Sequence, residues 1–400
     1  MHSRVTCRTR RNFLGLAACG AASPLLLHSA PAVTNRTETG VLIWSAHSII
    51  DATNRGIPVN EELITRWITH LADHGVNSIF WRGMYVGKST YRSRVMPRMS
   101  RTQHINFAGT RYPGTGAAET LKEFNQLAAA IENVDDFDAA RREAKRRGLA
   151  FYADVAPFDK FFPGLEETFY EEHPDLWFWS RDQKQRLRGL PCYAEPMARE
   201  RLRAEVKELI DRRVDGISIN LLSHQGGFKE QQPFGFNPSI VRIYKERWGS
   251  DILTEDYDPA RLSAIQGEIF TTTLTDIRAL IGNRRRLSVS IPRTKDGIES
   301  VTYCGTCKVD LDWRSWLKQG LVDDLSVLAE DPAATWTAEE IKKAAPNGRI
   351  LLMRKVRDPI MVPTVAQELA AIKTGTLDGL IITEGRIFEP AHTKWCQLFE

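Results

Sequence analysis

Short apolar segments alternate with amphipathic segments along the chain, from residue 41 to residue 383. Each short segment is apolar along its whole length, as in parallel strands that are buried on both faces. The apolar segments predict eight strands, at residues 41–44, 77–81, 149–155, 216–221, 287–291, 325–330, 349–353 and 377–383.

The longer segments between these strands have the period of an amphipathic helix. In residues 61–74 the apolar positions fall on one face, and Gly75 ends the pattern as a helix C-cap. The same period predicts further helices at residues 135–147, 198–213, 238–248, 262–281, 312–320, 337–345 and 364–374.

This alternation of strands and helices predicts an α/β protein of the (β/α)8 TIM-barrel class. A doubly wound sheet is the alternative, but it would carry a glycine-rich phosphate loop where this chain has Trp44-Ser45-Ala46-His47. Two connections are too long for simple turns: residues 87–118 after strand two, and the aromatic-rich residues 158–198 after strand three. We expect both to be long insertions at the active face.

Residues 1–32 have the features of an export signal. They hold arginines but no acidic residue, then an apolar run, then the small residues Ala30-Pro31-Ala32. Thr9-Arg10-Arg11-Asn12-Phe13-Leu14 resembles the twin-arginine motif. A Sec-type or mitochondrial-type leader is the alternative, and Leu16-Ala17-Ala18-Cys19 has the shape of a lipoprotein box. We expect export by the Tat translocase, cleavage near Ala32, and a periplasmic or secreted single barrel domain of residues 33–400.

The charge balance argues against a nucleic-acid or anionic-lipid partner. The chain has 54 Lys+Arg and 50 Asp+Glu, and the excess equals the four arginines of residues 1–32. The mature chain would therefore have no net charge and no basic field. No other apolar run approaches the ~20 residues that span a bilayer, so we expect no integral membrane segment in the mature chain.

The CxxC motif Cys304-Gly305-Thr306-Cys307 predicts a local disulfide in an oxidising compartment. A redox site would need a helix that starts after the first cysteine. A zinc site would need a second pair of ligands, which Cys192 and Cys396 do not form. We therefore expect neither a metal nor a cofactor.

Several stretches of the chain resemble a known group, the glycoside-hydrolase-like (β/α)8 barrel proteins that bacteria export. The stretches that carry the resemblance are residues 173–177, 192–196, 215–220, 234–238 and 311–324. The resemblance covers most of residues 40–390 and implies a barrel fold with a carbohydrate ligand. One departure concerns the fourth strand, which ends in DGIxxD in that group. Here Asn220 stands at the final position, and strand seven runs into Arg354, so the usual carboxylate pair of retaining barrels is missing.

Barrel enzymes place their chemistry at the C-terminal ends of the strands. Glycoside hydrolysis needs two carboxyl groups, one protonated and one ionised. The carboxylates at these strand ends predict Asp154, Glu330 and Glu384 as catalytic residues. A structural ion pair with a nearby arginine is the alternative for each of them.

Other polar and aromatic side chains near the strand ends are candidates for substrate binding. They are Trp44, Trp81, Arg82, Tyr152, Trp177, Tyr193, Glu195, Asn220, His224 and Arg354. Sugars stack on aromatic rings in ligand clefts. We nevertheless expect most aromatic residues of the second insertion to pack that loop onto the barrel.

The sequence thus predicts a glycoside hydrolase that acts on a carbohydrate. One alternative is a non-catalytic carbohydrate-binding barrel that has lost its fourth-strand acid. Another is a metal-assisted hydrolase built on His47, Asp154, His224 and Glu384, although no ligand-spacing motif supports it. Activity on a polysaccharide panel distinguishes the glycoside hydrolase from the non-catalytic binding barrel. A stoichiometric amount of metal in the purified protein would indicate the metal-assisted hydrolase.

Replacing Arg10 and Arg11 together by lysine should leave the precursor in the cytoplasm, because the Tat pathway reads the arginine pair and not its charge. Cell fractionation with an antibody against the barrel measures the effect. Replacing Arg4 and Arg8 by lysine is the matched control and should not alter export. Undiminished export of the Arg10/Arg11 variant would contradict the Tat assignment.

Overall fold

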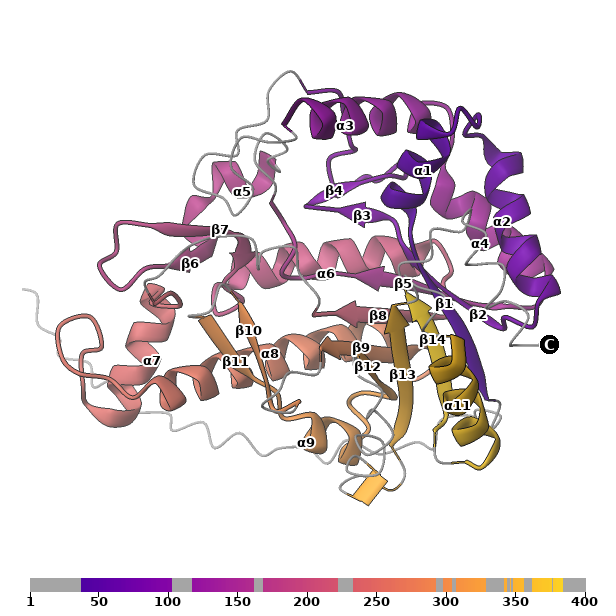
Figure 1. Ribbon diagram of the computed structural model, residues 1–400. Coiled ribbons are helices and arrows are strands. Elements are labelled where there is room, and N and C mark those ends of the chain that lie inside the picture. Colours follow the sequence, from indigo (N-terminus) through magenta and orange to yellow (C-terminus); the bar gives the residue numbers. More distant parts are fainter. Residues whose placement is uncertain are drawn as a thin grey trace, which may run out of the picture. The chain divides into compact units, whose positions relative to one another are not determined.

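The barrel is seen in a computed structural model, which describes residues 37–102, 117–161, 168–221, 233–292, 298–303, 307–328, 342–343, 346, 348–355, 362–375 and 377–383. Eight parallel strands close into a barrel in the order β1-β14-β13-β12-β9-β8-β5-β2 (Figure 1). The predicted fold class is confirmed. The barrel strands are β1 (Glu38–Trp44), β2 (Ser78–Arg82), β5 (Ala150–Val155), β8 (Gly216–Asn220), β9 (Arg286–Pro292), β12 (Asp324–Leu328), β13 (Arg349–Lys355) and β14 (Gly379–Thr383).

The helices that surround the strands largely follow the predicted pattern. They are α1 (Ser45–Asn54), α2 (Glu61–Asp73), α3 (Ala117–Ile131), α4 (Asp136–Arg146), α6 (Pro196–Asp211), α7 (Pro238–Trp248), α8 (Pro259–Ile281), α9 (Trp313–Lys318) and α11 (Val362–Lys373). Local polar contacts start several of them: Asn60 caps α2 and Asp135 caps α4, each through its side-chain oxygen. Most of the predicted helix at residues 337–345 lies outside the described residues.

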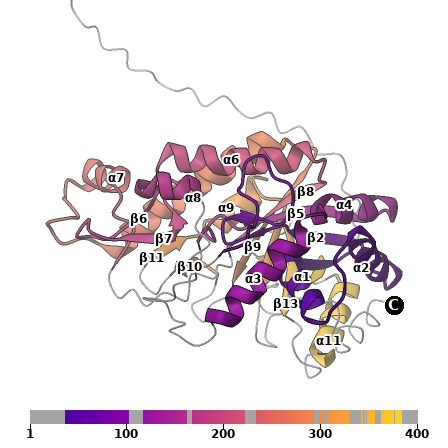
Figure 2. The ribbon, with the colours of Figure 1, turned by 90° about the horizontal axis from the view of Figure 1, so that it is seen from above.

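Helices α1 and α3 were not predicted, and they pack against each other (Figure 2). α1 starts directly after β1, so no polar turn separates the two elements in the sequence. The first two residues of α3 fall within the segment that was predicted as a polar insertion.

Small additional elements stand outside the barrel after three of its strands (Figure 1). The connection after β2 contains the hairpin β3–β4, and the connection after β5 contains α5, the short helix η1 and the hairpin β6–β7. The connection after β9 contains the hairpin β10–β11, which was not predicted and packs on α8. Their bounds are β3 (Met84–Tyr85), β4 (Lys88–Ser89), α5 (Thr168–Glu172), η1 (Pro174–Leu176), β6 (Trp177–Trp179), β7 (Arg186–Pro191), β10 (Ser300–Tyr303) and β11 (Cys307–Asp310).

The interior of the barrel is filled by large side chains from some strands and small ones from others. Phe80 of β2 and Tyr152 of β5 stack with ring centroids 4.6 Å apart and an interplanar angle of 7°. The following strands β8, β9 and β12 place small residues on the inner face, namely Gly216, Ser218, Ser288, Ser290 and Ser326. These serines show that the strands are not uniformly apolar. Several of their inner positions are Ser, while their outer positions are Ile, Val or Leu.

A network of charged residues crosses the interior at the N-terminal ends of the strands. Arg286 of β9 donates through Nε and Nη2 to the two carboxylate oxygens of Asp324 on the neighbouring strand β12. Arg349 of β13 forms two further ion pairs. Its Nη1 lies 3.3 Å from Oδ1 of Asp324, and its Nη2 lies 3.0 Å from Oε2 of Glu38 on β1. This end of a barrel serves stability rather than chemistry. No helix within the described ranges has both the length and the apolarity needed to cross a membrane.

Gly216→Ala should lower the free energy of unfolding by about 2 kcal/mol, the usual cost of overpacking a core. A Cβ at this position would lie 2.5 Å from the Tyr152 ring and 2.8 Å from the carbonyl oxygen of Arg286. Because Phe80 is stacked on Tyr152, that ring cannot move away freely. Urea unfolding measures the change, with Glu200→Ala on the exposed face of α6 as a control that should shift stability by less than about 0.5 kcal/mol. If Gly216→Ala were as stable as Glu200→Ala, the Tyr152 ring would not be packed against Gly216 as described.

Candidate functional site

The C-terminal end of the barrel interior is polar, and its centre is Asp154. The carboxylate Oδ1 accepts a hydrogen bond from Arg82 Nε at 2.6 Å. Asn220 Nδ2 lies 3.4 Å from Oδ1 and 3.2 Å from Oδ2, and Ser218 Oγ donates to Oδ2 at 3.1 Å. We call these four residues together with Trp44 the mouth layer. They come from β1, β2, β5 and β8, which are neighbours in the barrel.

The aromatic side of the mouth layer is built around Trp44, the last residue of β1. The Arg82 guanidinium carbon lies 4.2 Å from the centroid of the indole, a cation–π contact. His47 stacks on the same indole at 5.1 Å and 20°, and His47 Nε2 lies 3.4 Å from the hydroxyl of Tyr85 in the β3–β4 hairpin. Contacts within the protein therefore already use much of the indole surface.

The contacts of Asp154 are those of a residue in a structural ion pair with an arginine, the alternative to a catalytic role. Its side chain has no exposed surface, and both of its oxygens accept hydrogen bonds from protein donors. A carboxylate held in this way is suited to orienting Arg82. A direct catalytic role for Asp154 stays a prediction.

Trp81 and Arg354 do not line the mouth, and the expectation that they do was wrong. Successive residues of a strand point to opposite faces, so both side chains point outward, toward the helices. Trp81 Nε1 donates to the Asp136 carboxylate of α4 at 3.1 Å, and burial raises the pKa of Asp136 to about 6. Arg354 forms a buried ion pair with Glu368 of α11. Trp81 and Arg354 are therefore removed from the candidates for substrate binding.

Tyr152 is in the interior but lies below the mouth layer, where it is stacked on Phe80. Trp177 and Tyr193 instead make contacts within the connection that follows β5. Trp177 stacks on Tyr170 at 4.6 Å, and the hydroxyl of Tyr193 donates to the carbonyl of Pro157 at 2.7 Å.

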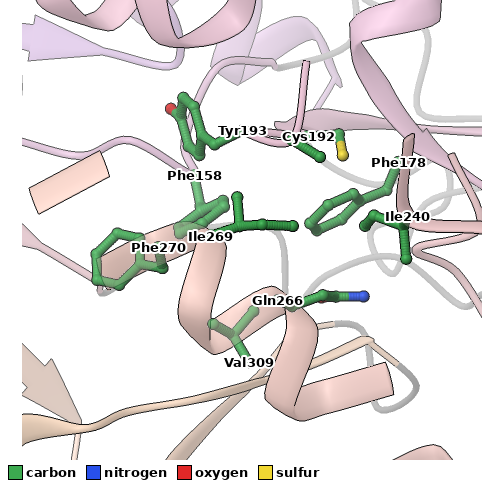
Figure 3. A pocket seen from close by; sticks show the side chains of 10 residues that line it. Phe158, Phe178, Cys192, Tyr193, Ile240, Gln266, Ile269, Phe270 and Val309 are labelled. Atoms are coloured by element: carbon green, nitrogen blue, oxygen red, sulfur yellow. The ribbon is translucent and has the colours of Figure 1, made fainter. Parts of the chain in front are cut away.

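Tyr193 borders a small apolar cavity between this insertion and helix α8 (Figure 3). Figure 3 shows its hydroxyl pointing away from the cavity, whose lining includes Phe158, Phe178, Ile269 and Phe270. The cavity has a volume of about 10 Å³. That is room for one water molecule at most, so a sugar cannot bind there.

The remaining predicted acids lie apart from the mouth layer or outside the described residues. Glu195 is the N-cap residue of α6, and no hydrogen bond or ion pair within the described part of the chain links it to Asp154. Glu330, Glu384 and His224 lie outside the described residues. In chain order, the two glutamates follow the C-terminal ends of β12 and β14.

The predicted disulfide is likewise not tested, because Cys304 lies outside the described residues. Cys307 is buried, with Sγ 3.4 Å from Oε1 of Gln266. Among the described residues there is no group of three or more His, Cys, Asp or Glu side chains arranged to hold a metal ion.

Ser218 and Tyr85 belong to the site or its edge but were not predicted. Ser218 could have been found from the alternation in β8, where Gly216, Ser218 and Asn220 face inward while Ile217 and Ile219 face the helices. No comparable signal marks Tyr85, since its position depends on how the short β3–β4 hairpin folds over the barrel.

No protein-family model and no curated protein sequence matches the chain. Solved structures do match it at the level of the fold. A β-galactosidase from the psychrophilic Marinomonas ef1 aligns with a TM-score of 0.54 and 8% identity, over 90% of this chain and 59% of that one. A GH20 exo-β-N-acetylglucosaminidase from Vibrio harveyi, in complex with N-acetylglucosamine, aligns with a TM-score of 0.50 and 11% identity, over 91% and 54%. At such identities the likeness shows a shared barrel fold.

Asp154→Asn should lower the free energy of unfolding by about 3 kcal/mol, because it leaves the buried Arg82 guanidinium without its counter-charge. Asp211→Asn removes the exposed pair with Lys207 and is the matched control, with an expected change below about 1 kcal/mol. Urea unfolding of both variants measures the difference. Wild-type stability of Asp154→Asn would mean that the ion pair does not hold the mouth layer together.

Proposed function

We propose that the protein hydrolyses a glycosidic bond in a carbohydrate bound at the C-terminal face of the barrel. The observation that carries the proposal is the mouth layer, where a buried Arg82–Asp154 pair, Asn220 and Trp44 lie above the stacked rings of Phe80 and Tyr152. Convergent polar groups beside an aromatic ring at this end of a barrel are typical of a ligand site.

The two carboxyl groups of the proposed reaction are Glu330 and Glu384. Glycoside hydrolysis needs a pair of carboxyls, and the oxygens of Asp154 are already committed to protein donors. β12 and β14, which the two glutamates follow in the chain, are separated in the barrel by β13 alone. Thr383, the residue before Glu384, pairs with Leu42 of β1, the strand that ends in Trp44.

The proposal assigns Asp154 the role of positioning Arg82 at the mouth. Glu195 and His224 remain candidates for binding. The leader-like residues 1–32 support a periplasmic or secreted site of action after Tat export, with residues 33–400 as the mature barrel. The ligand is a carbohydrate, and no nucleic-acid partner is proposed.

A non-catalytic carbohydrate-binding barrel is the second candidate. It is favoured by one observation: among the described residues, the carboxylate that lies in the mouth layer is held in an ion pair. Binding of a glycan by the wild-type protein without any turnover would support this candidate over the hydrolase.

Glu384→Gln and Glu330→Gln should each lower turnover by ~10² or more if these residues act in acid/base chemistry, because the amide keeps the shape but cannot exchange a proton. Reducing-end release from the polysaccharide that the wild-type protein degrades measures turnover. Glu132→Gln, at an exposed residue of an ion pair with Arg101, is the matched control and should retain full activity. Full activity in both test variants would reject these two residues as the catalytic pair.

A further inference from the structure

We infer that Arg82 binds an oxyanion of the ligand, so that the carbohydrate recognised at the mouth layer is an acidic sugar. The group it takes is a carboxylate, as in a uronic acid, or a sulfate ester. The inference rests on the proposed function, because it names the substrate class for the same site.

The hydrogen bonding of Arg82 is incomplete. Its side chain is 1% exposed and donates from Nε to Asp154. Nη1 and Nη2 are both buried, and neither has a hydrogen-bond partner in the part of the chain that the structure describes. Buried polar groups in folded proteins are nearly always hydrogen-bonded. A pair of donors on a buried guanidinium that no described residue uses therefore indicates an acceptor outside the described residues, and in this inference that acceptor is the ligand.

The opposite end of the same barrel provides an internal comparison. Arg286 and Asp324 also form a pair between neighbouring strands, but there Arg286 donates through both Nε and Nη2 to both carboxylate oxygens. Neither side chain leaves a buried nitrogen or oxygen without a partner within the described residues. Arg286 thus uses Nε and Nη2 in its pair with Asp324, whereas Arg82 uses only Nε in its pair with Asp154.

The second carboxylate oxygen of Asp154 already has two donors other than Arg82. Ser218 Oγ and Asn220 Nδ2 both donate to Oδ2, whereas Arg82 donates from Nε to Oδ1. The indole of Trp44 packs against the face of the guanidinium. The edge formed by the two Nη groups is then what remains for a ligand, and its parallel donors match the paired oxygens of a carboxylate or sulfate.

The charge of the mouth layer also permits an anion. Arg82 and Asp154 carry opposite charges, and Asn220 supplies a neutral amide that donates to Asp154. A carboxylate at position 220 would add a second negative charge beside Asp154 and would repel an anionic ligand. Neutral hydroxyl groups could also accept from Nη1 and Nη2, but hydrogen bonds between ionised partners are about twice as strong as neutral ones.

Calorimetric titration of the full mature protein with matched sugars tests the inference. The probes are glucuronate and galacturonate for the carboxylate source, glucose 6-sulfate for the sulfate source, and glucose and galactose as neutral counterparts. We expect at least one acidic sugar to bind ~10-fold or more tightly than its neutral counterpart, from the charge-assisted contact. Tighter binding of a uronate would identify a carboxylate as the recognised group, and tighter binding of glucose 6-sulfate would identify a sulfate ester.

Arg82→Gln should weaken acidic-sugar binding by about 10- to 100-fold and neutral-sugar binding by much less, so that the preference for the acidic sugar is lost. Arg286→Gln is the matched control: it breaks the Arg–Asp pair at the other end of the barrel and should not alter the preference for acidic sugars. If Arg82→Gln does not fold, Arg82→Lys keeps the positive charge, lacks the Nη edge, and should still lose most of the preference.

The outcomes separate the inference from the proposed function. Neutral sugars that bind as tightly as acidic ones would overturn the acidic-sugar inference and leave carbohydrate binding intact. An acidic preference that survives in both Arg82 variants would overturn the role of Arg82. Failure of every sugar to bind to the wild-type protein would overturn both proposals.

Discussion

The alternation of side chains along the barrel strands is the constraint on which the rest of this structure depends. Once eight strands close into a barrel, each residue faces either the interior or the helices, and its neighbour faces the other way. In β2, Arg82 therefore points inward to Asp154, while Trp81 points outward to Asp136. In β13 the same rule places Met353 inside and Arg354 outside, against Glu368.

The interior of the barrel changes character from one end to the other. Its N-terminal end is closed by the network of Glu38, Arg286, Asp324 and Arg349. The middle is filled by the stacked rings of Phe80 and Tyr152, for which the inner positions of the following strands leave room. Above these two layers lies the mouth layer, at the end where barrel enzymes bind their substrates.

The mouth layer combines strong internal contacts with a pair of Arg82 donors for which the described residues supply no acceptor. In the proposed role, the ion pair holds the guanidinium at a fixed orientation for an acceptor on the ligand. Such preorganisation reduces the cost of ordering a side chain when the ligand arrives. In the same proposal, Asp154 acts as a fixed partner of Arg82 rather than as an acid or base.

The sequence by itself determined the class and order of the fold, because strand burial and helix amphipathicity are written in local periodicity. All eight strands and the helices α2, α4, α6, α7, α8, α9 and α11 follow from those periods. Strand position also indicated Asp154 and Asn220, since barrel strands end at a common face. Only the tertiary structure decided which residues near a strand end face inward. Arg82 faces the interior and pairs with Asp154, whereas Arg354 faces the helices and pairs with Glu368. Apolar runs such as Leu351-Leu352-Met353 do not indicate which residues face inward. Both faces of such a strand are buried, so a shift by one residue leaves the apolar pattern unchanged.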